Sequence, residues 1–160
     1  MGNANNEQHR PRRFFSCTFL IIVIFGVHPV SAHEMLVKIG DFAEIELPPG
    51  AALKQSQGQM PDFSVYYVTR MDKKLLGIYF GNSPEMDQSR LQSEYKFGRC
   101  VGRVLDRPSA NGRDLDAVLE LQGGTFPRFI HFFSRGLSHQ EVSDVYYSCH
   151  TFRMLGDRSC

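Results

Sequence analysis

Histidine side chains are the first candidates for chemistry in this chain, because they bind metal ions and transfer protons near neutral pH. His139 and His150 fall eleven positions apart in a stretch that predicts a helix. About three helical turns separate such positions, which is too far for one metal ion. His131 would join one of them only if its strand edge reached that helix. We therefore expect no metal site from these three residues.

His33 would present an amine and an imidazole together if cleavage made it the N-terminus. This chelating pair suits copper, but a third nitrogen ligand would be needed and the sequence shows none. We therefore predict no metal and no other cofactor, and His33 is the one alternative position for copper.

The acidic and nucleophilic residues do not form a catalytic pattern. Asp114 and Asp116 fall on one face of a strand edge, where two carboxylates can share a proton or bind calcium. We interpret them as part of a solvated turn. Cys149 and His150 are helical neighbours whose side chains point about 100° apart. An enzyme remains an alternative, and it would need His131, His139 or an acidic residue to converge in a concave pocket.

Two arginines give the sequence its best binding patch. Arg99 and Arg103 alternate with apolar residues on one face of an expected strand, a mixture found in the centres of interfaces. Tyr66, Tyr67 and Tyr79 would extend the patch if their strands are neighbours. The alternative is that the arginine stems cover a sheet face beneath a helix. The apolar residues that alternate with them are Phe97, Val101 and Leu105.

Cysteine positions favour one disulfide in an oxidising compartment. Cys100 falls in an expected strand and Cys149 in a helix that would cover it. A bridge between them closes a loop of about 50 residues and would stabilise the fold by roughly 3–4 kcal/mol on the chain-entropy argument. Two buried free thiols are the alternative. Cys160 is expected to be unpaired.

Residues 1–32 have the three-part layout of a signal peptide. Three arginines between positions 10 and 13 precede an apolar run, and its strictly apolar part, 19–25, is far shorter than the roughly 20 residues of a spanning helix. The small residues Val30-Ser31-Ala32 then fit a signal peptidase. We expect cleavage after Ala32 and export to the periplasm or the secreted space; an uncleaved membrane anchor is the alternative.

The remaining segment, 33–160, has the length of a single domain, with an ordered core expected over about 35–155. Its net charge falls from +1 to about −1 when residues 1–32 are removed. A near-neutral domain lacks the basic surface that nucleic acids require. Residues 33–160 contain no second apolar segment, so we expect no membrane span in them.

Hydrophobic periodicity predicts seven strands, a short middle helix and a long final helix. Ser83 and Pro84 suggest that the middle helix runs over 84–95. Ser138 and Glu141 form a capping box for the final helix, which carries an apolar stripe. The order predicts an α+β layered sandwich, a mostly antiparallel sheet with the long helix packed on it. The expected strands are 35–39, 42–47, 63–69, 75–80, 97–106, 115–121 and 126–133.

This plan resembles the small sandwich family of the PsbP proteins and the Ran-binding Mog proteins. The resemblance rests on Ile45-Glu46-Leu47-Pro48-Pro49-Gly50, on the strands around Tyr66-Tyr67 and Tyr79-Phe80, and on the helix end at 148–152. It covers about 42–155 and implies a non-enzymatic accessory or binding domain. None of the family's functional residues maps onto this sequence. We therefore expect an exported binding module whose partner is another protein or a small ligand of the cell envelope.

Overall fold

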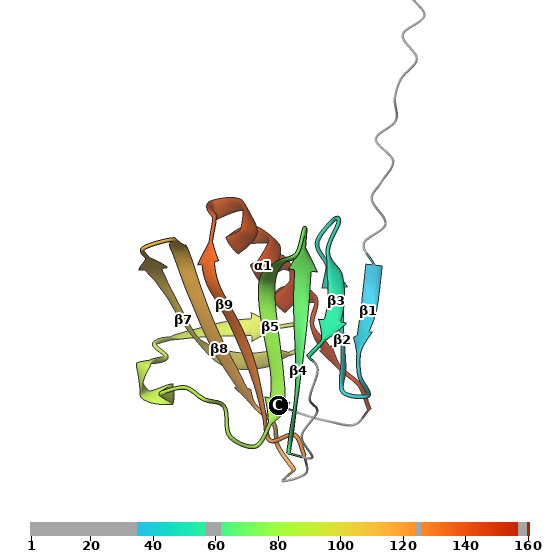
Figure 1. The fold of residues 1–160 in the computed structure, drawn as a ribbon. Helices are drawn as coiled ribbons and strands as arrows, with labels where there is room; N and C mark the ends of the chain where they lie inside the picture. The colour runs from blue at the N-terminus through green and yellow to red at the C-terminus, as the bar shows by residue number, and fades with distance from the viewer. Residues whose placement is uncertain (1–34, 57–61, 124–125, 157–159) are drawn as a thin grey trace, which may run out of the picture. The chain divides into compact units, whose positions relative to one another are not determined.

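The computed structural model describes residues 35–56, 62–123, 126–156 and 160. These residues form ten β-strands, one α-helix and one 3-10 helix, η1 (Gln88–Arg90) (Figure 1). The expected leader and His33 lie outside the described residues. No helix within the described ranges is long and apolar enough to cross a membrane. The other elements are β1 (Met35–Ile39), β2 (Ala43–Leu47), β3 (Ala52–Gln55), β4 (Phe63–Arg70), β5 (Lys73–Gly81), β6 (Ser93–Phe97), β7 (Cys100–Ser109), β8 (Gly112–Glu120), β9 (Phe129–Leu137), α1 (His139–Thr151) and β10 (Arg153–Met154).

Seven strands form one antiparallel sheet in the order β3-β4-β5-β9-β8-β7-β6. Most neighbours in this sheet follow one another in the sequence. The exception is the segment 82–92, which leaves β5 in the middle of the sheet and reaches β6 at its edge. Strand β9 then returns beside β5 and completes the sheet.

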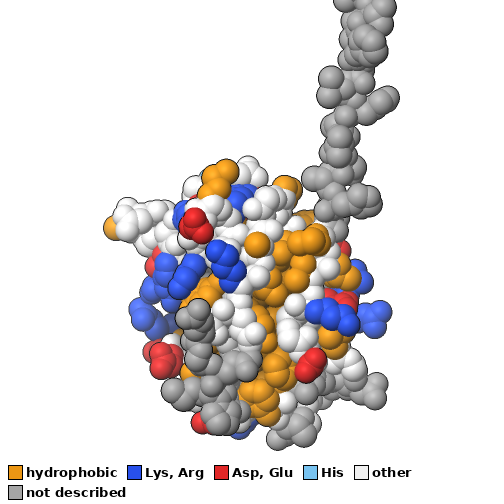
Figure 2. All heavy atoms as spheres, turned by 45° about the vertical axis from the view of Figure 1, so that its right-hand side comes forward, with side chains coloured by type: hydrophobic (Ala, Val, Ile, Leu, Met, Phe, Trp, Pro, Cys, Tyr) orange, Lys and Arg blue, Asp and Glu red, His pale blue; other side chains and the backbone are white. Residues whose placement is uncertain are grey.

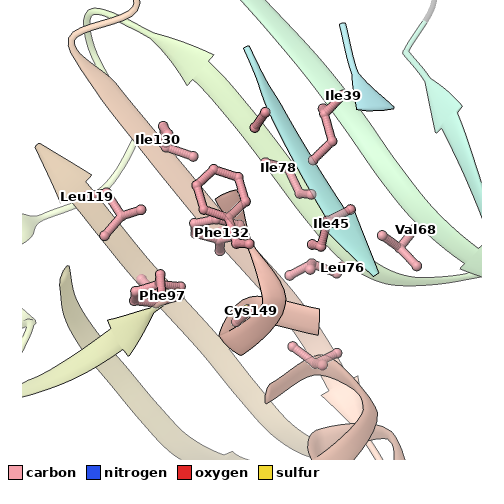
Figure 3. Close-up of a cluster of buried hydrophobic side chains, with 14 of the residues drawn as sticks. Ile39, Ile45, Val68, Leu76, Ile78, Phe97, Leu119, Ile130, Phe132 and Cys149 are labelled. Carbon is pink, nitrogen blue, oxygen red and sulfur yellow. The ribbon is translucent and has the colours of Figure 1, made fainter. Parts of the chain in front are cut away.

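One face of this sheet is covered by α1 and by a small sheet with the order β1-β2-β10. Figure 3 shows side chains from both sheets and from the helix meeting in one core, among them Ile45, Ile78, Phe132 and Cys149. Burial of these apolar groups is the main term that holds the layers together. The expectation of a mostly antiparallel α+β fold with a C-terminal helix on the sheet is confirmed.

Helix α1 starts where its capping box predicts. The Glu141 backbone N–H donates to Ser138 Oγ, and the Ser138 N–H donates to Glu141 Oε2 at 2.7 Å. The first two turns are also tied to the β4–β5 hairpin, because Lys73 Nζ lies 2.7 Å from Glu141 Oε2 and Arg70 Nη1 lies 2.7 Å from Asp144 Oδ2. Local capping and long-range ion pairs therefore fix the same end of the helix.

The predicted middle helix over 84–95 is wrong. Only the single turn of η1 forms there, and Ser93–Phe97 pairs with β7 as strand β6. The apolar positions of this stretch were weakly periodic, so strand pairing with backbone hydrogen bonds outweighs the helical tendency. The expected strand 97–106 is likewise divided. Gly98 adopts φ +57° in a turn, and its N–H donates to the His150 carbonyl at 3.0 Å.

The predicted Cys100–Cys149 disulfide is also wrong. Cys100 is bonded to Cys160, with 5.4 Å between the Cα atoms, and Cys149 is a buried free thiol. Burial raises the pKa of the Cys149 thiol. Cys149 faces the core from α1, whereas Cys160 reaches the start of β7 after β10 has paired with β2. A disulfide indicates an oxidising compartment.

Candidate ligand-binding site

The face of the large sheet opposite α1 carries aromatic side chains. Because side chains alternate along a strand, every second residue of β4, β5 and β9 points to this open face. Neither α1 nor the small sheet covers this face. Phe63, Tyr67, Tyr79 and Phe133 are all half-buried there and form the walls of a depression of about 390 Å³. We call this feature the outer depression.

Strand register brings the walls together. Val65, Tyr79 and His131 form one row across β4, β5 and β9. The rings of Phe63 and Tyr79 are stacked, with centroids 5.7 Å apart and an interplanar angle of 28°. Offset stacking is a favourable aromatic geometry, and both rings line the outer depression.

The neighbouring row contains Tyr67, Gly77 and Phe133. A β-carbon on Gly77 would overlap the Phe133 ring, so the missing side chain lets that ring lie against the sheet. Phe133 then meets Tyr67 edge to face, with centroids 6.1 Å apart. Lys74 Nζ lies 4.0 Å from the centroid of Tyr67, a cation–π distance. The glycine thus flattens the floor of the outer depression.

Three charged or titratable groups lie at one side of the outer depression. His131 Nε2 is 3.0 Å from Asp116 Oδ1, and Arg135 Nη2 is 2.9 Å from the same oxygen. The side chains of His131 and Asp116 are 8% and 7% exposed, whereas that of Arg135 is 53% exposed. Arg135 is therefore the member of this trio that solvent or a ligand can reach.

Asp116 is held as a carboxylate. Burial alone would raise its pKa, but hydrogen bonds from His131 and Arg135 and the charge of Arg135 outweigh burial, and the pKa of Asp116 is lowered. An ionised carboxylate only accepts hydrogen bonds, so His131 Nε2 carries the proton of the hydrogen bond between His131 and Asp116. The trio therefore positions the His131 ring beside Phe133, with centroids 5.3 Å apart.

The opposite side of the outer depression is formed by the segment that follows β5. The Tyr79 hydroxyl donates to the Ser83 carbonyl at 3.0 Å and accepts from the Ser83 N–H at 3.3 Å. These bonds place Ser83 and the exposed Glu85 at the rim. Across 35–56, 62–123, 126–156 and 160, Glu85 forms no ion pair, so its carboxylate faces solvent.

The residues predicted as a binding patch do not form one surface. Arg99 lies in the turn before β7. Arg103 lies on the open face and donates to Gln88 Oε1 at 3.2 Å. Tyr66 is 6% exposed and points into the core, where burial and then the charge of Asp41 raise the pKa of its hydroxyl. Tyr67 and Tyr79, in contrast, line the outer depression, so the structure places these two residues of the predicted patch in this site.

The other chemical candidates lie apart from one another. His139 and His150 are exposed on α1 and do not line the outer depression with His131. Asp114 accepts from the Gly136 N–H at 3.0 Å and does not share a proton with Asp116. No group of three or more His, Cys, Asp or Glu residues in the described ranges could hold a metal ion.

A larger hollow of about 760 Å³ lies beside the disulfide, between Arg99 and Arg153. Gly156 and Cys160 line it, and residues 157–159 between them are outside the described part.

Sequence reasoning missed Phe63, Phe133 and Arg135 and did not pair His131 with Asp116. The alternation of apolar residues over 63–67, and the alternation of His131, Phe133 and Arg135, could have indicated that each set lies on one face of its strand. Only the register of β9 between β5 and β8 shows that these residues meet on one face.

No protein-family model matches this chain, and no curated protein or solved structure shows significant similarity to it.

Proposed function

We propose that this chain is an exported, non-catalytic binding module, and that the outer depression binds a small neutral ligand. The observation that carries the proposal is the set of half-exposed aromatic rings on the open face of the sheet. Apolar area left in water costs about 25 cal/mol per Å², and an antiparallel sheet with one open face normally presents polar residues there. Apolar patches rimmed by polar groups mark binding sites.

The size and composition of the outer depression support a small ligand. About 390 Å³ lies within the range of pockets that bind small molecules, which combine apolar walls with a few polar groups. Arg135 is compensated by Asp116, so its positive charge does not act alone on a ligand. This balance favours a neutral ligand over an anion.

Export is supported by the signal-peptide pattern of residues 1–32 and by the Cys100–Cys160 disulfide. The resemblance to the PsbP and Mog proteins implies the same class of function and stays a prediction. N-terminal sequencing of the protein recovered from its expressing cells should begin at His33. An intact N-terminus in the membrane fraction would instead establish the tethered form.

Binding is tested by titrating the purified, disulfide-intact protein with phenol and recording ¹H–¹⁵N spectra. We expect the amide signals of Tyr67, Tyr79, His131 and Phe133 to shift, and we expect Tyr79→Ala to abolish these shifts. Shifts confined to residues outside the outer depression would overturn the assignment of the site.

A further inference from the structure

We infer that the ligand of the outer depression is a neutral saccharide that lays one sugar ring on the Phe63–Tyr79 surface. This inference rests on the proposed function, since it names the ligand class of the same site. It is carried by the combination of partly accessible aromatic rings with hydrogen-bond donors and acceptors at the rim of the same depression.

The aromatic surface suits the C–H face of a pyranose ring. The rings of Phe63 and Tyr79 are stacked at an interplanar angle of 28°, and both residues are half-buried, so their rings are partly accessible. The face of an aromatic ring carries partial negative charge, whereas the axial C–H groups of a sugar carry partial positive charge. A sugar ring therefore stacks on such a surface without displacing a well-bound water from a polar wall.

The rim supplies donors and acceptors for hydroxyl groups. Three N–H groups of Arg135 donate within the described part of the protein, to Leu115 O, Ser134 O and Asp116 Oδ1, and two of its five N–H groups remain. Across the depression, the Glu85 carboxylate offers acceptor oxygens. A sugar hydroxyl both donates and accepts, so it can use both sides of this rim.

The balance of charge distinguishes a saccharide from other ring-containing ligands. Asp116 lies 2.9 Å from Arg135, and Glu85 adds a second negative group at the rim, so an acidic ligand gains little. A proline-rich peptide would use the aromatic rings but has few groups that could satisfy both Arg135 and Glu85. A neutral sugar is the ligand that uses the floor and the rim together.

The experiment titrates the disulfide-intact protein with cellobiose, maltose and N,N′-diacetylchitobiose up to about 20 mM, because a site with a Kd of about 1 mM nears saturation there. Glucuronic acid, decaproline and phenol are run beside them. We expect at least one of the three sugars to shift the amide signals of Phe63, Tyr79 and His131, and glucuronic acid to bind more weakly.

Two variants and a control make the test specific. Tyr79→Ala should weaken sugar binding about tenfold, the size of a lost aromatic stacking contact. Glu85→Ala, at an exposed position, removes the acceptor at the rim and should weaken sugar binding more than it weakens phenol binding. Tyr147→Ala on α1 removes an aromatic ring outside the depression and should leave both unchanged.

The outcomes separate this inference from the proposed function. If phenol or decaproline shifts these signals and no sugar does, the saccharide assignment fails and the site stands. If a sugar binds to Glu85→Ala and to Tyr79→Ala as tightly as to the wild type, the saccharide assignment also fails. If none of the probes shifts signals in the outer depression, both proposals fail.

Discussion

Phe133 of β9 lies over Gly77 of β5, in a position where a β-carbon on Gly77 would overlap the phenyl ring. Gly77→Ala must therefore move the ring away from Tyr67 and from the sheet. We expect the variant to lose about 1 kcal/mol of unfolding free energy, the low end of the cost of overpacking. Urea unfolding followed by circular dichroism measures this loss.

The same substitution in a Phe133→Ala background is the control. Without the ring there is no overlap, and alanine is preferred over glycine in a strand because it has less backbone entropy to lose. Gly77→Ala should then be neutral or stabilising. A loss of equal size in both backgrounds would show that Phe133 does not cause the cost.

Asp116 is the buried acceptor shared by His131 and Arg135. Asp116→Asn keeps the shape of the side chain but removes the charge that both donors face. The amide oxygen of asparagine can still accept both bonds, but a hydrogen bond to a charged acceptor is worth more than one to a neutral acceptor, so we expect a loss of about 1–2 kcal/mol in unfolding free energy. Chemical denaturation at neutral pH measures it.

Asp72→Asn is the matched comparison, because Asp72 is 97% exposed and lies 3.4 Å from Lys54. Exposed pairs contribute about 0–1 kcal/mol, so this variant should lie near the wild type. Equal losses of unfolding free energy in the two variants would mean that the buried trio stabilises the fold no more than an exposed ion pair does.

The sequence contains enough local signal to predict α1 and most strands, but not the open face. The capping box of Ser138 and Glu141 and the helical spacing of Val145 and Cys149 are local, so the helix was predicted correctly. Residues 75–80 are apolar on both faces, a pattern typical of a strand that is covered on both sides. The structure covers one side, and aromatic rings lie on the other. A periodicity cannot distinguish a covered face from an apolar face that is left open.

The disulfide and the edge strands depend on contacts distant in sequence. Loop-closure entropy changes slowly with loop length, so it does not choose between Cys149 and Cys160 as the partner of Cys100. Strand β3 is a polar edge strand whose backbone pairs with β4. Its side chains show little of the apolar alternation from which a strand is predicted. For Tyr79, a strand position was enough to suggest a surface role. For Arg135 and His131, only the pairing of β8 with β9 brings Asp116 between them.

Glu141 makes the stability of α1 depend on pH. A hydrogen bond from Lys73 and another from the Ser138 backbone lower the pKa of Glu141 from 4.5 to about 2. A carboxyl group with a depressed folded pKa contributes stability above its unfolded pKa, and that stability is lost as the pH falls through the folded pKa. We expect the urea midpoint of the wild type to fall between about pH 4.5 and pH 2.

Glu141→Gln should show a lower midpoint at pH 7 and a smaller decline over the same range. Glu94→Gln, at an exposed position in β6, is the control and should keep the decline of the wild type. A Glu141→Gln protein with the full decline would assign the pH dependence to other carboxyl groups.

The Cys100–Cys160 bridge closes a loop with a sequence separation of 60. On the chain-entropy argument such a loop is worth about 4 kcal/mol, so Cys160→Ser should lose a large part of the stability of the domain. Cys149→Ser is the matched variant, since Cys149 is a free thiol inside the core. It should keep the disulfide and lose only the cost of placing a hydroxyl in an apolar site. Thermal unfolding without reductant measures both losses, and mass spectrometry reports the bridge as two missing hydrogens. If Cys149→Ser were the variant that gained two hydrogens and Cys160→Ser kept the bridge, Cys100 would be paired with Cys149 after all, and the path of the chain after β10 would have to be redrawn.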